Sequence, residues 1–465
     1  MLGSLSASAA VALGERGRRR AVLVATILAS AVVFLDGTVV NVALPAIQRD
    51  LGGGLTLQQW VVDAYLLTLG SLILLGGRLG DLYGERRVFL LGGTAFGVTS
   101  LVCAAAPTGT FLIVARGFQG GAGAVLTPAA LATIAATFTG EERGAAIGTW
   151  TAWAGIGTVV GPLLGGWLVG ALSWRSIFVL NVPLLLVTLA LAAVAVPART
   201  QRERPRLDVV GAVLCVVGLG GTVFALIEHA HRGWSDPGIL ATLVSGVVAL
   251  VLFLAWERRT PSPMMPLGLF ARRNFSASNA ETFAVYAALS TTTFFLVLFL
   301  QQLNGYSAFR SGLALLPVTL ALFALSRAIG RWSARLGPRL FMTLGPVLCA
   351  GGVALFARLD RGASYWVEIF PGVIAFALGL ACIVAPLTTT VLAGVGEGET
   401  GIASGINNAV ARIGGLLGIA AVGAIAAGKR GQLDVHGFHV AMIVTAGFLL
   451  VGGAIGFVAI RKVSP

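Results

Sequence analysis

Long apolar stretches recur along the whole chain and leave one class of fold. Fourteen such stretches can be counted between residues 21 and 460. A helix needs roughly 20 mostly apolar residues to cross the hydrocarbon core of a membrane, whereas barrel strands would show shorter segments in which apolar and polar residues alternate. The pattern therefore predicts an all-α polytopic membrane protein with fourteen transmembrane helices.

Composition argues against the other broad classes. The chain is 57% hydrophobic and only 11% charged, whereas soluble domains carry about 25% charged residues and disordered chains lack this much apolar surface. Its cysteines (Cys103, Cys215, Cys349 and Cys382) lie inside apolar runs without metal-ligand spacing, and its four histidines lie near predicted outer loops. No metal, other cofactor or enzyme activity is predicted.

The distribution of basic residues predicts the orientation. With the N-terminus placed inside, 22 of the 32 Lys and Arg residues fall on inner loops and tails and 8 on outer loops, as the positive-inside rule requires. The net charge of +13 is then explained by inner loops that face anionic lipid, not by a nucleic-acid partner. The 30 Arg against 2 Lys are typical of a GC-rich bacterial gene. We therefore expect the protein in a bacterial inner membrane, and the distribution of basic residues places both termini in the cytoplasm.

An internal repeat divides the chain. The segment from Gly77 to Arg86 aligns with the segment from Gly330 to Arg339, about half the chain later, and duplicated halves are common in secondary transporters. We therefore expect a cytoplasmic tail (1–20), a six-helix bundle (21–196), a linker with two inserted helices (197–256), and a second six-helix bundle with a short tail (257–465).

Seven motifs occur in order along the chain. They are residues 35–45 (LDGTVVNVALP), 60–65 (WVVDAY), 77–87 (GRLGDLYGERR), 115–120 (ARGFQG) with Pro128, a glycine-rich stretch at 155–167, residues 174–183, and 401–408 (GIASGINN). Together they resemble the major facilitator superfamily, in its fourteen-span drug:proton antiporter branch. The resemblance covers almost the whole chain and implies a major facilitator fold of two six-helix bundles plus two central spans.

The glycine-rich stretch has a physical interpretation of its own. Gly157, Gly161 and Gly165 repeat every four residues, just over one helical turn, so they share one smooth face. Such a face lets another helix approach closely, and Pro162 removes a backbone donor from the same helix. The resemblance implies an antiporter motif that shapes the rocking motion, while static packing is the alternative.

The loop after the second span is expected to form a conformational latch. It carries Gly77, Asp81, Gly84, Arg86 and Arg87, and the resemblance implies that these residues hold one conformation closed. A positive-inside anchor with a solvated acid is the alternative interpretation. The second copy of the repeat has Ala334 in place of Asp81, so a second latch is not predicted.

Ionisable residues inside the spans are the sharpest functional signal, because a charge in mid-membrane costs several kcal/mol. Asp36, Arg116, Asp63 and Glu281 are predicted to couple proton movement, with Asp36 and Arg116 as the core that the resemblance also implies. Asp63 could instead be interfacial. Glu281 could instead be an acid that reaches the inner surface near Arg272 or Arg273.

Polar and aromatic residues within apolar helices predict the substrate path. The candidates are Asn41, Gln119, Tyr286, Gln301, Asn407, Asn408 and Arg412. Gln301 could lie at the outer rim, and Arg412 could be a structural lock. No soluble domain that would transmit a signal is visible in the sequence.

The sequence predicts a monomeric proton-coupled transporter in the lipid bilayer that exports lipophilic, cationic, drug-like small molecules by alternating access, in exchange for protons. A carrier of one specific metabolite and a transporter-like sensor are the alternatives.

Overall fold

The computed structural model describes residues 14–197, 207–393, 395–396, 399–428 and 432–461 and is built from helices. The N-terminal half contains α2 (Gly14–Leu51), α3 (Gly54–Tyr83), α4 (Glu85–Ala104), α5 (Gly109–Thr137), α6 (Gly140–Ala171), α7 (Ser176–Val179) and α8 (Asn181–Ala195). Two further helices follow, α9 (Val209–Arg232) and α10 (Pro237–Glu257).

The C-terminal half contains η1 (Leu267–Ala271), α11 (Arg273–Leu298), η2 (Phe299–Leu303), α12 (Ala308–Leu336), α13 (Pro338–Phe356), η3 (Tyr365–Ile369), α14 (Phe370–Ala393), α15 (Thr400–Ala426) and α16 (Val435–Ala459). The inner end of the molecule is defined here as the end where α3 meets α4, and the outer end as the end where α2 meets α3.

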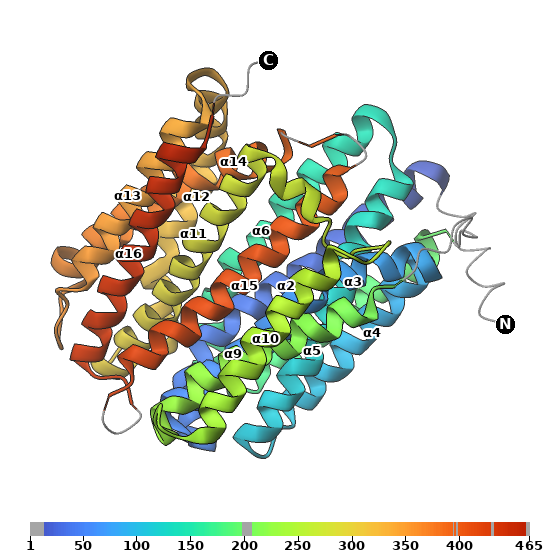
Figure 1. Ribbon diagram of the computed structural model, residues 1–465. Coiled ribbons are helices and arrows are strands. Elements are labelled where there is room, and N and C mark those ends of the chain that lie inside the picture. The colour runs from blue at the N-terminus through green and yellow to red at the C-terminus, as the bar shows by residue number, and fades with distance from the viewer. Residues whose placement is uncertain (1–13, 198–206, 394, 397–398, 429–431, 462–465) are drawn as a thin grey trace.

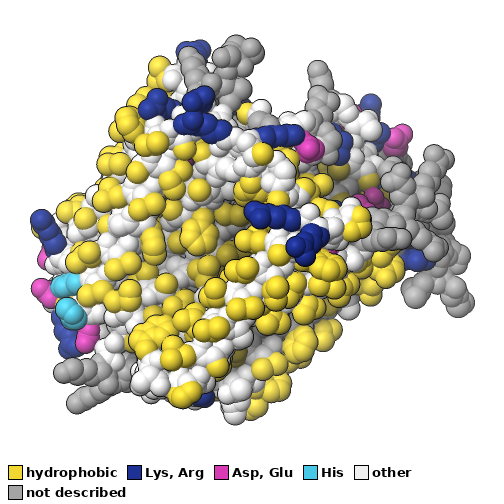
Figure 2. Space-filling model, in the orientation of Figure 1, with side chains coloured by type: hydrophobic (Ala, Val, Ile, Leu, Met, Phe, Trp, Pro, Cys, Tyr) yellow, Lys and Arg dark blue, Asp and Glu magenta, His cyan; other side chains and the backbone are white. Residues whose placement is uncertain are grey.

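Thirteen helices in the described part of the chain are long and apolar enough to span a membrane. The apolar segment found in α6, Val160–Ala171, is shorter than these thirteen helices. Apolar side chains cover the sides of the helices on the face in Figure 2, and Lys and Arg gather mainly toward the helix ends. The chain is therefore a multi-pass membrane protein.

The first helix begins at Gly14, inside the expected tail and ahead of the apolar stretch that starts at residue 21. An ion pair of 2.9 Å between Glu15 and Arg19, one turn apart, supports this polar part of the helix. Residues 1–13, most of the polar linker (198–206) and the last four residues (462–465) lie outside the described residues.

Figure 1 shows α11 to α16 on one side and the N-terminal helices on the other, with α9 and α10 in front. Helix α9 packs against α10 and also contacts α3 and α15, which belong to different halves. The pair α9–α10 therefore lies over the junction between the halves.

The sequence repeat has matching backbone geometry. Gly84 ends α3 and Gly337 ends α12, and both have a φ of 91°. Their N–H groups donate to Gly80 O and Ser333 O at 3.0 and 2.9 Å. Because only glycine adopts this φ without strain, the two equivalent turns explain why these glycines occur at matching positions.

Close helix packing in the N-terminal half depends on glycines. A Cβ on Gly120 of α5 would collide with the carbonyl oxygen of Tyr65 and with Oγ1 of Thr68 on α3, whereas a Cβ on Gly117 would meet nothing within 4 Å. The backbone of α3 therefore lies directly against α5 at Gly120.

We expect Gly120→Ala to lower the free energy of unfolding by about 1–3 kcal/mol, because the added methyl group forces two backbones apart. Gly117→Ala in the same helix is the matched control and should be neutral or slightly stabilising, since alanine favours helices. Thermal unfolding of the purified variants measures both effects. Equal melting temperatures for the two variants would contradict this packing.

Candidate functional site

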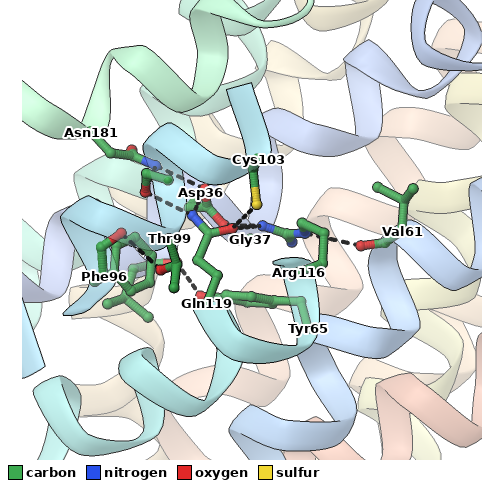
Figure 3. Close-up of polar contacts among 12 residues, drawn as sticks. Asp36, Gly37, Val61, Tyr65, Phe96, Thr99, Cys103, Arg116, Gln119 and Asn181 are labelled. Carbon is green, nitrogen blue, oxygen red and sulfur yellow. Dashed lines mark hydrogen bonds and ion pairs between the residues drawn. The ribbon is translucent and has the colours of Figure 1, made fainter. Parts of the chain in front are cut away.

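A buried ion pair lies in the middle of the N-terminal half. Nη1 of Arg116 on α5 is 2.5 Å from Oδ2 of Asp36 on α2 (Figure 3). The side chain of Asp36 is 0% exposed and that of Arg116 is 1% exposed. The two residues predicted as the coupling core thus form an ion pair away from bulk solvent.

Neutral donors complete the shell of the carboxylate. Oδ1 of Asp36 accepts from Nε2 of Gln119 at 3.0 Å and from Nδ2 of Asn181 at 2.9 Å. Both amides also donate to Oγ of Ser100, at 2.9 and 3.2 Å. Gln119, predicted as part of the substrate path, is thus fully buried here as a partner of Asp36.

The guanidinium of Arg116 is held on several sides. Its Nε donates to the carbonyl of Val61 at 3.0 Å, and Nη1 also donates to Oε1 of Gln119 at 2.7 Å. Its charge lies over the ring of Tyr65 at 4.2 Å and near that of Phe178 at 5.7 Å. Together with the carboxylate, these contacts compensate the burial of a cation.

The arrangement has a chemical consequence. Two amide N–H groups and one guanidinium point at the carboxylate, so the shell satisfies the ionised form of Asp36. Oδ1 accepts two hydrogen bonds and Oδ2 accepts one, so a proton can enter only at the remaining position on Oδ2, beside the guanidinium. Because a neutral carboxyl no longer balances the Arg116 cation, a proton at Asp36 weakens the contact between α2 and α5.

Sequence reasoning missed part of this site. Asn181 was noted only within the motif at 174–183, and Tyr65 and Ser100 were not selected. All three are polar side chains in otherwise apolar spans and all are fully buried. That combination is the signal that could have found them, because buried polar groups need partners.

The other two predicted coupling acids lie apart from this network. Asp63 on α3 and Glu281 on α11 are each 0% exposed. None of their carboxyl oxygens has a hydrogen-bond partner among the described residues. Glu281 packs toward Gly452 of α16 inside the C-terminal half. Both carboxyl groups are therefore enclosed by protein.

The glycines of α6 contact both halves. A Cβ on Gly161 or Gly165 would collide with Thr38 or Val39 of α2, and Gly312 of α12 lies against the carbonyl of Pro162. Gly157 is in the same helix, but its surroundings lie in a stretch (154–159) outside the described side chains. Gly161 and Gly165 of the predicted smooth face therefore pack against α2, whereas α12 contacts the neighbouring residues Pro162 and Gly166.

Three glutamines join the halves at the outer end. Nε2 of Gln59 donates to the carbonyl of Ile419 at 3.2 Å. Nε2 of Gln301 donates to the carbonyl of Val42 at 3.0 Å, and Gln302 donates to Gln48 at 2.9 Å. Gln301 therefore takes part in closing the outer end.

We expect Gln59→Leu to increase the population open at the outer end about fivefold, because it removes a buried hydrogen bond worth about 1 kcal/mol across the halves. Gln58→Leu is the matched control, since Nε2 of Gln58 has no partner in the described structure. Spin labels on the outer ends of α3 and α15 report the distance distribution. Identical distributions for both variants would rule out this role.

The predicted latch has no closed ion pair here. Asp81 is exposed and forms no ion pair with a described residue, while Arg86 donates to the carbonyl of Ala193 on α8 at 2.5 Å. Arg78 donates to the carbonyl of Pro263 at 2.7 Å, in the segment that leads to the C-terminal half. Gly77 lies near Pro128 of α5.

An ion pair of 2.7 Å joins Arg272 and Glu399 at the inner end of the C-terminal half. The hydrogen bond from Arg272 lowers the pKa of the Glu399 carboxyl below its usual value. The pair is therefore present at neutral pH and is lost as the pH falls through this lowered value. It ties the segment before α11 to the start of α15.

The remaining candidates for the substrate path differ in their hydrogen bonds and in their exposure. Asn407 is bound within the C-terminal half, with Nδ2 donating to Thr282 at 2.8 Å and to Asn279 at 3.2 Å. Asn41 makes one weak contact within its own helix, to Gly37 O at 3.5 Å. Asn408 is exposed, and Tyr286 and Arg412 are partly exposed.

The chain is similar to known membrane transporters in sequence. The family model described as Major Facilitator Superfamily matches residues 26–419. The puromycin resistance protein pur8 of Streptomyces alboniger is 36% identical and the alignment covers 99% of this chain and 95% of that protein. The multidrug resistance protein Stp of Mycobacterium tuberculosis is also 36% identical, over 89% of this chain and 77% of that protein.

Solved structures agree on the fold. A peptide transporter, POT, in complex with sulfate has a TM-score of 0.68 at 14% identity, covering 94% of this chain and 93% of that one. A bacterial homologue of the human lysosomal transporter Spinster, in an inward-facing and unoccupied conformation, has a TM-score of 0.66 at 17% identity, covering 95% and 97% of the two chains.

Proposed function

Because this chain belongs to the Major Facilitator Superfamily, we propose that it is a proton-driven antiporter that exports lipophilic, drug-like small molecules from a bacterial cell. Relatives named for resistance to puromycin and to multiple drugs, at 36% identity over most of the chain, support an export role. In this proposal the protein works as a monomer with fourteen spans, α6 being the fourteenth, and with both termini cytoplasmic.

The observation that carries the proposal is the buried pair of Asp36 and Arg116. A carboxylate that is shut off from water, and whose ion pair with Arg116 weakens when it takes a proton, connects protonation to the packing of α2 against α5. Arg116 sets how readily the proton enters. Asp63 and Glu281, buried without partners in the described structure, are further proton sites in this scheme.

The moving parts follow from the contacts between the halves. Helix α6 slides against α12 at Pro162 and Gly166 while the outer glutamines release, and the space between the halves then opens to the opposite side. At the inner end, Asp81 with Gly77, Gly84, Arg86 and Arg87 closes the latch when the halves approach there.

Reconstituted vesicles test the proposal. Purified protein is placed in proteoliposomes with a pH-sensitive dye inside, and a panel of lipophilic cations, anions and neutral compounds is added under an imposed proton gradient. An antiporter moves protons out of the acidic lumen as a compound enters, so at least one compound should raise the lumenal pH.

The alternatives give different results in the same vesicles. A symporter moves protons and compound in the same direction, and a sensor moves neither. A carrier of one metabolite gives no signal with any member of the drug panel. Any of these results, with correctly folded protein, would overturn the proposed export function.

A further inference from the structure

Arg412 is an unpaired cation between the halves of the molecule. It lies 12 residues into α15, or about 18 Å from the start of that helix at 1.5 Å per residue. In the described structure the only contact resolved for its guanidinium is with the ring of Phe34 on α2, at 5.3 Å, and no acidic side chain forms an ion pair with it. The residue therefore reaches from the C-terminal half to the N-terminal half at mid-depth.

The surroundings of Arg412 are aromatic and accessible. Phe34, Tyr286 and Arg412 are each partly exposed. Helix α11, which carries Tyr286, lies directly against α15, with Gly414 against Phe283 and Gly418 against Ala287. No polar atom of Arg412 or Tyr286 is among the fully buried atoms that lack partners. A ligand at mid-depth can thus reach both a guanidinium and aromatic faces.

Every other charge identified within the spans is unavailable to such a ligand. Asp36 and Arg116 neutralise one another and are closed off by their shell. Asp63 and Glu281 are 0% exposed. Arg412 is therefore the accessible charge in this set, and an unpaired cation at this depth is costly unless an anion compensates it.

We propose that Arg412, with Phe34 and Tyr286, binds the acidic group of lipophilic organic anions, so that the preferred substrates are aromatic carboxylates instead of cations. The guanidinium offers a planar pair of donors that matches a carboxylate, and the rings hold the apolar body. The inference rests on the proposed export function for its biological meaning, but it concerns binding alone.

A set of matched ligands tests the charge preference. The probes are 2-naphthylacetate, its amide 2-naphthylacetamide, and the cation 2-(2-naphthyl)ethylammonium, which share one ring system. Each is titrated by calorimetry at pH 7.5 into the full-length protein in nanodiscs of zwitterionic lipid, without a proton gradient. We expect the carboxylate to bind about tenfold or more tightly than the amide, and the cation to bind least.

Variants assign the preference to one side chain. Arg412→Gln should bring the carboxylate-to-amide affinity ratio close to one, and Arg412→Lys should retain part of it, because an ammonium keeps the charge without the planar fork. Arg310→Gln is the matched control. Arg310 is an exposed residue near the outer end of α12 whose guanidinium also lies over an aromatic ring, that of Tyr306, at 5.6 Å.

The outcomes separate the two proposals. Equal or tighter binding of the amide or the cation to the unmodified protein overturns the inference. So does an unchanged ratio in Arg412→Gln, even with a lowered melting temperature, because the guanidinium would then serve packing against Phe34 only. A carboxylate preference without proton exchange in vesicles would leave the inference standing and remove the export proposal.

Discussion

Arg116→Ala is expected to lower the free energy of unfolding by about 3–5 kcal/mol, because it leaves the buried carboxylate of Asp36 without its cation. The substitution also removes a large side chain that is 1% exposed and strips a partner from the carbonyl of Val61 and from Gln119. Thermal unfolding in detergent and the folded yield after size-exclusion chromatography measure the loss.

The matched control for this variant is Arg175→Ala. Arg175 makes the same types of contact near the outer end, pairing with Asp50 at 2.6 Å, lying over Trp174 at 4.3 Å and donating to the carbonyl of Ala106 at 3.2 Å. Its ion pair is 38% and 47% exposed, so solvent screens it and it should contribute far less to stability than the buried pair. Comparable losses in the two variants would show that burial does not set the strength of the Asp36–Arg116 pair.

A second variant separates charge from shape. In Asp36→Asn/Arg116→Gln both charges are absent and four amide side chains share the site with Ser100. This double variant should recover part of the stability lost in Arg116→Ala, since no unpaired charge remains in the interior. Failure to recover any stability would mean that the volume of Arg116, not its charge, dominates.

The sequence was sufficient to predict the helices and to select Asp36 and Arg116, because both depend on the cost of polar groups in lipid. Charged residues are so costly inside apolar spans that Asp36 and Arg116 stand out, and helices must satisfy their own backbone in lipid. The repeat alignment also placed Gly84 and Gly337 at equivalent positions, and the structure shows the same positive φ at both.

Other features depend on packing that no local pattern records. Gln301 and Gln302 reach α2 through a π-helical turn, Phe299–Leu303, at the end of α11. Such single turns widen a helix by one residue and have no simple sequence signal. Likewise, Gln119 and Arg412 are both polar residues in apolar helices, and only the three-dimensional contacts show that the first is enclosed and the second accessible.

Asp36→Asn is expected to abolish proton-driven transport. It also lowers the free energy of unfolding, because the buried guanidinium of Arg116 loses its counter-charge, but the loss should be smaller than in Arg116→Ala. The amide keeps the size of the carboxylate, and its oxygen can still accept from Arg116. Its new N–H group can donate to Oδ1 of Asn181, which has no partner in the described structure, if that amide turns over. The site therefore stays hydrogen-bonded, but it can no longer bind or release a proton at this position.

Two transport assays on the same proteoliposomes isolate the coupling step. Asp36→Asn should reduce uptake driven by a proton gradient to the level of empty vesicles, whereas exchange of labelled for unlabelled compound without a gradient should persist. Asp50→Asn is the matched control, because Asp50 is a 47% exposed carboxylate on the same helix that also pairs with an arginine. Full gradient-driven uptake by Asp36→Asn would exclude Asp36 as the proton carrier, and loss of both activities in folded protein would place it in substrate binding instead.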